Sequence, residues 1–586
     1  MVLLTRTLPS FDLWPFAVSV QLTTPCRKLH IESTKSQPSP KLDHYSTKIP
    51  SLKKVTSHPI IAVSMERLFQ LLSAPGCRSA VECAAPTQII PGTPEEENKN
   101  ELSIPENSNS MVAYNIKPKD GRLDRGLDRV VDWSGSQTVF FFILIALLTW
   151  ALMGIRFGTN TKWQVFISDA QAIINMIFDA FLMRQQLNSY DELMFVTACL
   201  RSRTSSNKRM LRKLMASGEY ENPQPAQFHE LQQTEFLSDL PRENLLGRVS
   251  TGVSIFMGHI GTVGLYWVCI FIWIGFGRYC SWSNTWQLYI NSATSALMVF
   301  ILAFLANIRA RHSKYSAKCL EHIHKVDTAL ETRLRTVTSD TIPNTSVLIP
   351  VPKRGRLQRA IDYYADLVGT LLGIAILAFV MVLWVALGPV LHFDSNWWLL
   401  IGTYAGLVGL NDGFVLCNIQ SILGRHLSTE FTHLIHSDHD MLSEIRISSQ
   451  SEEYVVKPSL TSRISIAVGK FCSHELTVVG GVVMILALVI GASVMRWSVT
   501  GQLLCNVPPS IIESFFMMIL ITGHDIADAK MRVDLHNVYL RRLKLVSWVD
   551  SLGDEKKEGE MDMQVVEVNE EMIAAVPHAF VVEARL

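Results

Sequence analysis

The strongest constraint on this chain is a series of eight apolar segments, each long enough to cross a lipid bilayer. A helix needs roughly 20 mostly apolar residues to span the hydrocarbon core. Four segments are almost purely apolar, and each is followed, after a short connector, by a second segment that carries more polar side chains. The predicted spans lie near 138–155, 164–183, 254–276, 286–306, 367–387, 397–416, 476–495 and 503–522. The sequence therefore predicts an all-α polytopic membrane protein made of four helical hairpins.

Composition supports this class and excludes several others. Apolar residues make up 48% of the chain and charged residues 18%, whereas soluble domains carry about 25% charged residues. Lys+Arg and Asp+Glu balance at 53 each, so no positive field favours nucleic acid as a partner. The ten Cys are scattered without a C-x-x-C pair, and we expect neither a disulfide framework nor a thiolate metal site. Nucleotide-binding and hydrolase motifs are also missing from the sequence, so we expect no enzyme.

The distribution of Lys and Arg predicts that both termini are cytoplasmic. The connectors within the hairpins hold few of these residues, whereas the segments between hairpins are rich in them, and positive residues concentrate in cytoplasmic loops. Three second helices begin alike, with "WQVFISDA" (163–170), "WQLYINSA" (286–293) and "WWLLIGTYA" (397–405). Each hairpin also follows an amphipathic lead-in. These features favour four parallel repeats, although Trp also recurs at membrane interfaces simply as an anchor.

The ends of the chain differ from the apolar centre. We expect residues 1–120 to be a disordered cytoplasmic N-terminal region, with a weak transit peptide as the alternative for residues 1–64. Residues 121–550 form the predicted transmembrane domain, and 551–586 an acidic cytoplasmic tail. Three segments between hairpins are long enough for amphipathic helices that pack beneath the membrane. They are 185–250, 308–360 and 418–470.

Polar side chains gather in the second helix of each hairpin, which suggests that first helices face lipid and second helices line an interior. At 100° per residue, Asn175 and Asp179 lie within about 40° of each other on one helix face. Glu513 and His524 also share a face, about 16 Å apart along the helix axis. The residues proposed to line a path are Asp169, Asn175, Asp179, Asp412, Glu513, His524 and Asp528.

Buried acids need a partner in a membrane. An ionised carboxylate at the bilayer centre costs about 2.5–3.5 kcal/mol even on a lenient scale, so Asp179, Asp412 and Glu513 require water, a cation or a proton. Oxygen ligands with an occasional imidazole suit Fe²⁺, Mn²⁺ or Zn²⁺, and a proton relay would use the same residues. Structural explanations remain open: Asp179 could pair with Arg184, and Asp412 could cap a broken helix.

Two further features carry alternatives. Pro508 and Pro509 open the last span, either as a helix break that frees carbonyls near an ion site or as an ordinary first turn. The stretch "RHLSTEFTHLIHSDHD" (425–440) holds a candidate cytosolic metal cluster, although such His spacings are also common by chance. Its residues are His433, His436, His439 and Asp440.

Long motifs of this chain closely resemble the fungal low-affinity iron permease family. They include "WQVFISDAQAIINMIFDAFLMRQQL", "DSNWWLLIGTYAGLVGLNDGFVL" and "MRWSVTGQLLCNVPPSIIESFFMMIL", and the resemblance extends over roughly residues 120–550. It implies a permease of the plasma membrane that imports ferrous iron, with Zn²⁺, Cu and Mn²⁺ as further substrates. It also implies no permanently bound cofactor. The lipid bilayer and divalent metal ions are then the partners, and a homo-oligomer is compatible with this reading.

The sequence departs from the family pattern in two places. The family tends to read His-Asn-x-Ala-Asp after the last span, whereas this chain has Asp525 directly after His524. The extra acid could change the metal preference. In addition, "MERLFQLLSAPGCRSA" looks like the usual start of family members, so we hypothesise that Met65 is the natural initiator and that residues 1–64 are an extension of the gene model.

We therefore expect Fe²⁺ to be captured near Asp169, coordinated by Asn175, Asp179, Asp412 and Glu513, and released past His524 and Asp528. Two alternatives belong to other classes. One is a membrane sensor or scaffold that transports nothing and whose buried acids pair with Arg. The other is a proton-coupled carrier of another small solute.

Overall fold

The computed structural model describes residues 75–88 apart from 77, residues 114 and 119, residues 121–217 apart from 159, and residues 245–447 and 460–554. Met65, most of the predicted N-terminal region and nearly all of the acidic tail lie outside the described residues. Within the described part, six helices are long and apolar enough to cross a membrane, or eight if two bent pairs are each one span. The expected all-α membrane fold agrees with this result.

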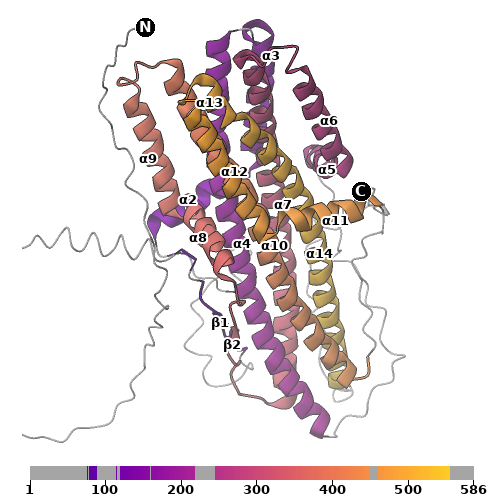
Figure 1. Cartoon of the computed structure of the whole chain (residues 1–586). Helices are drawn as coiled ribbons and strands as arrows, with labels where there is room; N and C mark the ends of the chain where they lie inside the picture. Colours follow the sequence, from indigo (N-terminus) through magenta and orange to yellow (C-terminus); the bar gives the residue numbers. More distant parts are fainter. Residues whose placement is uncertain are drawn as a thin grey trace, which may run out of the picture. The chain divides into compact units, whose positions relative to one another are not determined.

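The same order of elements occurs four times along the chain: a lead-in helix, a short apolar helix, a tight turn and a long helix (Figure 1). The lead-in helices are α2 (Arg122–Ser134), α5 (Leu245–Gly258), α8 (Arg356–Gly369) and α11 (Leu460–Cys472). The short helices are α3 (Gln137–Phe157), α6 (Ile260–Phe276), α9 (Leu371–Leu387) and α12 (Glu475–Val494). The long helices are α4 (Thr161–Ser217), α7 (Asn284–Thr338), α10 (Ser395–Glu444) and α14 (Val507–Asp554), with the short α13 (Val499–Leu504) before the last.

The long helices continue far beyond the predicted ends of their spans. They have 48 to 57 residues, and at 1.5 Å per residue a helix of this length is more than twice the thickness of the hydrocarbon core. Neither α4 nor α7 contains Gly or Pro, so no helix breaker ends them at the membrane surface. The first parts of the segments 185–250, 308–360 and 418–470 are therefore continuations of the spans, and the last parts hold the beginnings of separate lead-in helices.

Two of the short helices are shorter than predicted because the chain bends before them. The span predicted near 254–276 bends by 61° at His259, between α5 and α6, and the span near 367–387 bends by 67° before α9. His259 caps α6, because its ring accepts a hydrogen bond from the Gly261 N–H. The lead-in helices α5 and α8 are thus bent by 61° and 67° away from the short helices that follow them.

Turn chemistry fixes where two long helices, α7 and α10, and the short helix α13 begin. Three turns have two consecutive residues with positive φ, namely Ser281–Trp282, His392–Phe393 and Arg496–Trp497. The second residue of each pair donates its N–H to the carbonyl five residues earlier, at 2.9–3.0 Å. A Ser or Asp then follows whose side chain accepts a hydrogen bond from the N–H three residues on. This is the usual cap of a helix N-terminus.

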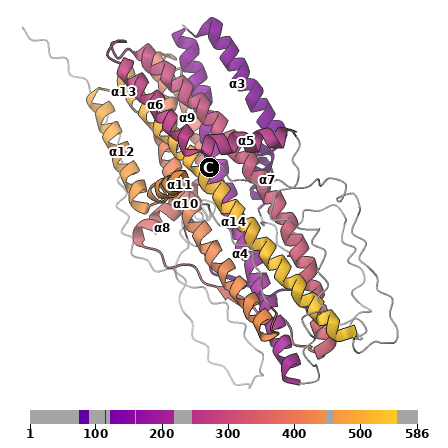
Figure 2. The ribbon, with the colours of Figure 1, turned by 90° about the vertical axis from the view of Figure 1, so that its right-hand side faces the viewer.

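The four long helices pack in a ring and run in the same direction. Helices α4 and α14 each contact both α7 and α10, and Figures 1 and 2 show all four side by side over their whole length. Near the turns, Asn291 of α7 bonds Ser168 of α4 with an offset of 123 residues; far from them, Asp327 pairs with Arg203 with an offset of 124. Between α7 and α14 the offset is 219 near the turns and 217 at the far end. Such constant register requires parallel helices.

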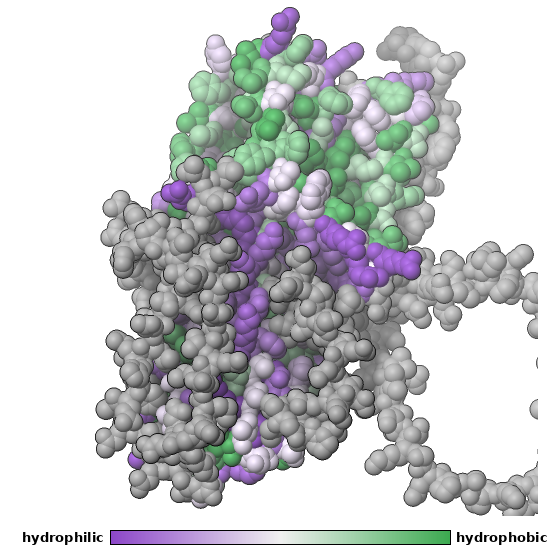
Figure 3. All heavy atoms as spheres, turned by 180° about the vertical axis from the view of Figure 1, so that it is seen from behind, coloured by the Kyte–Doolittle hydropathy of each residue, from purple (hydrophilic) through white to green (hydrophobic). Residues whose placement is uncertain are grey.

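The short helices pack around one half of the length of this ring, and most of their side chains are exposed. Only 6% of the apolar window of α3 and 17% of that of α12 is buried, against 56–78% for the four long helices. Figure 3 shows the corresponding band of hydrophobic side chains, with hydrophilic side chains gathered beyond it. The short helices are thus mostly exposed and the long helices mostly buried, as expected if first helices face lipid and second helices form the interior.

Beyond the band, the long helices form a second bundle, which we call the extension bundle: the parts of α4, α7, α10 and α14 past residues 190, 315, 423 and 531. Its centre holds arginines and acids that are at most 2% exposed. Arg542 of α14 pairs with Asp327 of α7 at 2.9 Å and with Asp438 of α10 at 2.8 Å. Arg203 of α4 pairs with Glu331 of α7 at 2.9 Å. Removing one partner of such a pair typically costs about 3–5 kcal/mol.

A short sheet ties an N-terminal segment to the extension bundle. Strand β1 (Val81–Cys83) pairs antiparallel with β2 (Val347–Ile349), with Val81 opposite Ile349. Cys83 forms a disulfide with Cys199 of α4, with Cα atoms 5.5 Å apart. The expectation that the cysteines form no disulfide is thus wrong for this pair, because 116 residues separate the two positions and only the fold brings them together.

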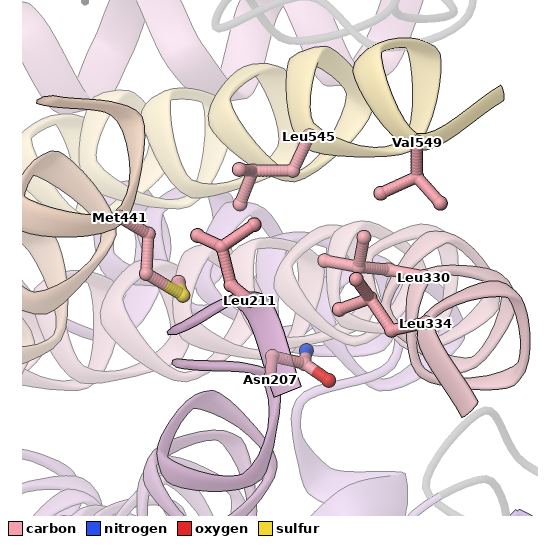
Figure 4. Close-up of a pocket in the computed structure, with 7 residues that line it drawn as sticks. All are labelled: Asn207, Leu211, Leu330, Leu334, Met441, Leu545 and Val549. Atoms are coloured by element: carbon pink, nitrogen blue, oxygen red, sulfur yellow. The ribbon is translucent and has the colours of Figure 1, made fainter. Parts of the chain in front are cut away.

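Asn207 gives a test of packing in the extension bundle. Its side chain is fully buried and its amide has no hydrogen-bond partner among the described residues. It adjoins a small cavity lined otherwise by apolar side chains (Figure 4), namely Leu211, Leu330, Leu334, Met441, Leu545 and Val549. We expect Asn207→Leu to raise the unfolding temperature of the purified chain, because an unpaired buried amide costs about 1–3 kcal/mol.

Leu334→Ala is the matched control, since it enlarges the same cavity and should destabilise the chain by roughly 2–5 kcal/mol. Thermal unfolding in detergent measures both variants. A lower unfolding temperature for Asn207→Leu would show that the amide has a buried partner, such as an ordered water.

Candidate functional site

A column of polar side chains runs along the axis of the four long helices. Helices α4 and α14 lie diagonally opposite in the ring, as do α7 and α10, so a side chain that reaches its diagonal partner must lie on the axis. Asp179 of α4 meets Glu513 of α14 in this way. Arg309 of α7 meets Gln420 of α10, with Nη2 2.6 Å from Oε1. The axis is therefore polar within the apolar band.

Asp179 and Glu513 meet at one level of this axis, and Asp412 lies nearby. Asp179, Asp412 and Glu513 are 0%, 2% and 5% exposed and come from α4, α10 and α14. Tyr364 of α8 donates its hydroxyl to Asp412 at 2.7 Å. The carboxyl groups of Asp179 and Glu513 lie next to each other. Neither oxygen of Asp179 receives a hydrogen bond from a donor within the described part of the chain.

This pair of acids has no cationic partner among the residues that the structure describes. Carboxylates are acceptors only, so two of them facing each other need a proton or a metal cation between them. In the described ranges, no Lys, Arg or His forms an ion pair with Asp179, Asp412 or Glu513. A scaffold whose buried acids pair with Arg would show such ion pairs at this level.

The two structural explanations considered for these acids do not hold. Arg184 points away from Asp179 and binds α2, with Nε 2.6 Å from Asp128 and Nη2 3.3 Å from Asp124. Partial burial acts to raise the pKa of Asp128, but the hydrogen bonds from Arg184 and Asn188 outweigh it, and the pKa lies below its usual value. Helix α10 continues unbroken through Asp412, so this residue caps no broken helix.

A second polar group lies on the same axis, nearer the turns. Asp169 is 2% exposed and neither of its oxygens has a partner among the described residues. Asn506 lies close by, since its side chain and that of Asp169 approach the same side of Gly402. Ser510 donates to the Asn506 carbonyl at 2.6 Å. Asp169 and Asp179 are ten residues apart on one helix, which corresponds to about 15 Å, so they form two separate levels.

The last span is broken beside this group. Helix α13 ends at Leu504 and α14 begins at Val507, so Cys505 and Asn506 form a turn between them. Pro508 and Pro509 then occupy the first turn of α14, where their missing N–H groups leave no hydrogen bond unmade. Both readings of the prolines apply: they begin a helix, and that helix follows a break.

Beyond the acids the axis becomes basic. Arg309 is 4% exposed and donates to the Leu182 carbonyl at 3.3 Å, one turn past Asp179. Further along, His312 Nδ1 lies 3.2 Å from His524 Nε2 and 3.2 Å from Asp528. Asp528 also pairs with Arg532. The structure thus joins the two predicted exit residues, His524 and Asp528, through a histidine of another helix.

The other predicted residues lie as follows. Asn175 is nearly buried on α4 between the two acid levels, and its carbonyl oxygen has no partner among the described residues. His433, His436, His439 and Asp440 are exposed on one helix, and Asp440 binds Lys208 at 2.9 Å. Throughout the described ranges, no three or more His, Cys, Asp or Glu side chains are grouped to hold a metal ion. The column is thus a series of small polar groups.

Sequence reasoning missed four residues of the column: Tyr364, Asn291, Arg309 and His312. Tyr364 lies in a lead-in helix, where the search for polar residues in the second spans could not find it. Asn291 lies within a second span, in "WQLYINSA", at the position that Ser168 occupies in "WQVFISDA", and this match was the available signal. Arg309 and His312 fall just past the predicted end of their span, so they looked like ordinary residues of a membrane interface.

Comparisons with known proteins agree with one another. Residues 246–339 and 461–580 match the low affinity iron permease family. The low-affinity iron/zinc ion transport protein fet4 of Schizosaccharomyces pombe is 33% identical over 532 residues, which cover 88% of this chain and 89% of the relative. The low-affinity Fe(2+) transport protein of Saccharomyces cerevisiae is 33% identical over 461 residues, which cover 73% and 84%. No solved structure matches the chain.

The unneutralised acids predict an unusual effect on stability. Asp179→Asn supplies an amide donor to Glu513 and removes one of two facing carboxylates, so we expect it to stabilise the chain by about 1–2 kcal/mol in metal-free buffer. Asp128→Asn is the control with the opposite sign, because it removes the partner of the buried Arg184. Thermal unfolding in detergent with a chelator present measures both.

Addition of a divalent cation extends this test. A ligand that binds only the folded state raises the unfolding temperature, so Fe²⁺ or Zn²⁺ should stabilise the unmodified chain and not Asp179→Asn. If Asp179→Asn instead destabilised the metal-free chain, the acids would have a structural partner after all.

Proposed function

Because the chain belongs to the low-affinity iron permease family, we propose that the polar column is the route by which ferrous iron crosses the membrane. One observation supports this proposal above the others: a pair of facing carboxylates, buried on the axis of four helices, that no cationic side chain in the described part of the chain neutralises. A divalent cation supplies the missing charge. A membrane protein that only needed stability would have an apolar or paired group there.

The order of groups along the axis suggests the order of events. Fe²⁺ first meets Asp169, then passes Asn175 and reaches Asp179 and Glu513, beside Asp412. Tyr364 holds Asp412 in place, and the cation leaves past His524, His312 and Asp528. Each level offers only one or two charged ligands, with water to complete the coordination. Weak binding at several levels suits an ion that must also leave, and it is consistent with low affinity.

The ligand chemistry suggests which ions share the route. Carboxylate and amide oxygens followed by imidazoles suit divalent cations of hard or borderline character, so we propose Zn²⁺ as a further substrate and Mn²⁺ and copper as weaker ones. The additional acid Asp525 accepts a hydrogen bond from Ser254 of α5 at 2.8 Å. It is therefore directed to the lead-in helix, and we propose that it affects metal preference less than Asp528.

We also propose the orientation. The extension bundle and the lead-in helices carry most of the Lys and Arg of the described residues, whereas the turns carry few. Positive residues favour the cytoplasmic side. The turns then face the outside of the cell, and the extension bundle lies in the cytosol. The membrane in question is the plasma membrane, and the four similar hairpins are parallel repeats.

Orientation can be tested by tag accessibility. A C-terminal epitope tag should be detected by antibody only after the cells are permeabilised, whereas a tag inserted in the turn at 280–283 should be detected on intact cells. Both tagged chains must first be shown to reach the cell surface by fractionation. Detection of the C-terminal tag on intact cells would reverse the orientation and with it the proposed direction of the path.

Transport itself is tested by uptake of radiolabelled Fe²⁺ in cells that lack their own iron importers. The unmodified chain should give saturable uptake that Zn²⁺ inhibits. Glu513→Gln should lower it roughly ten- to hundredfold, because a charge-assisted ligand contributes about 1.5–3 kcal/mol. Glu321→Gln, an acid on α7 whose side chain is 40% exposed, should have no effect. Full uptake by Glu513→Gln, at equal surface abundance, would remove this residue from the route.

A further inference from the structure

Helix α10 turns a row of glycines towards the polar column. Gly402, Gly406, Gly409 and Gly413 follow one another at intervals of four, three and four residues, so at 100° per residue they share one helix face. This face lies against α14 and the turn before it. Rows of small residues often serve only to let two membrane helices approach closely, so each glycine has to be considered by what a side chain would meet there.

Gly406 fits close packing. A Cβ atom at this position would lie 3.0 Å from the Cys505 carbonyl oxygen and 3.2 Å from the Asn506 Cα. Both neighbours are backbone atoms in the break between α13 and α14, and backbone cannot move aside as a side chain can. Gly406 therefore fixes the distance between α10 and this part of the last span.

Gly402 and Gly409 are different, because they face the free ends of polar side chains. A Cβ atom at Gly402 would lie 2.8 Å from Asn506 Nδ2 and 3.0 Å from Asp169 Oδ1. At Gly409 it would lie 2.6 Å from both carboxylate oxygens of Glu513. Asp169 is 2% exposed, has no hydrogen-bond partner among the described residues and still points at Gly402. The acid is thus directed at a place where the neighbouring helix α10 has no side chain.

We propose that Gly402 and Gly409 determine which cations pass, by keeping space for the ion and its water at the two acid levels of the axis. The inference rests on the proposed route and adds a role for the glycine face of α10, which lies against the acids. The two glycines lie on either side of Gly406, whose backbone contact sets how closely α10 approaches the last span. A methyl group at Gly402 or Gly409 would meet the free end of a polar side chain. That end must then move into the space beside the carboxylates, which is the space the cation uses.

The test compares three substitutions in the same helix. Gly409→Ala and Gly402→Ala should each lower the maximal rate of Fe²⁺ uptake at least fivefold, at equal surface abundance. The loss should be larger for Mn²⁺ than for the smaller Zn²⁺. Gly424→Ala is the matched control, since a Cβ there meets no atom within 4 Å, and it should transport like the unmodified chain.

A double variant separates loss of space from general damage to the helix. Glu513→Asp shortens the acid by one methylene and withdraws the carboxylate from Gly409. The pair Gly409→Ala with Glu513→Asp should therefore transport several times faster than Gly409→Ala alone and regain part of its Mn²⁺ uptake. Damage to helix packing would not be repaired by shortening a side chain.

Each outcome bears on the proposal. If the unmodified chain takes up iron and both glycine variants match it in rate and selectivity, the proposed role of Gly402 and Gly409 is wrong, while the proposed route is unaffected. Equal losses for Mn²⁺ and Zn²⁺ without rescue by Glu513→Asp would also overturn it, as would failure of both variants to reach the cell surface. If the unmodified chain takes up no metal, the proposed function itself fails.

Discussion

Asp179 and Glu513 lie next to each other without a fixed countercharge among the described residues. Facing carboxylates in a low-dielectric bundle repel each other and favour separation of the helices that carry them. The same helices hold a second ionic layer in the extension bundle, where Arg203 and Arg542 neutralise the buried acids. One axis thus has a fully paired layer outside the apolar band and an unpaired layer within it.

Continuity of the helices connects these two layers. Because α4 and α7 contain no Gly or Pro, their register is the same at both ends, and the paired network in the extension bundle holds the membrane part of each helix in place. A discontinuity occurs instead in the last span, at Cys505–Asn506, beside Asp169. Helices α4 and α7 are therefore continuous along the whole axis, whereas the backbone of the last span is irregular at the level where polar groups line the interior.

Much of the fold follows from local sequence, and much of the site does not. Apolar length predicted the six long apolar helices and the two bent helix pairs, and helical periodicity placed Asp179 and Glu513 on inward faces. Length could not predict where the long helices end, because the extension bundle is amphipathic and continues the same period. Tyr364 and His312 join the column only through tertiary packing, and Cys83 meets Cys199 for the same reason. The His433 cluster is the opposite case, a group predicted from local spacing that the fold does not complete. Its residues lie on one exposed helix, and no other element among the described residues adds a ligand to them.

Arg309 gives the column a direction. Its guanidinium lies one turn beyond Asp179, bound to the Leu182 carbonyl and the Gln420 amide. These partners are neutral, so the positive charge acts on the axis. A cation held between Asp179 and Glu513 is therefore attracted by the acids on one side and repelled by Arg309 on the other. Along the proposed route, the acids in this conformation would accept a cation from the side of Asp169, and release towards His524 would require that Arg309 move or that its charge be compensated.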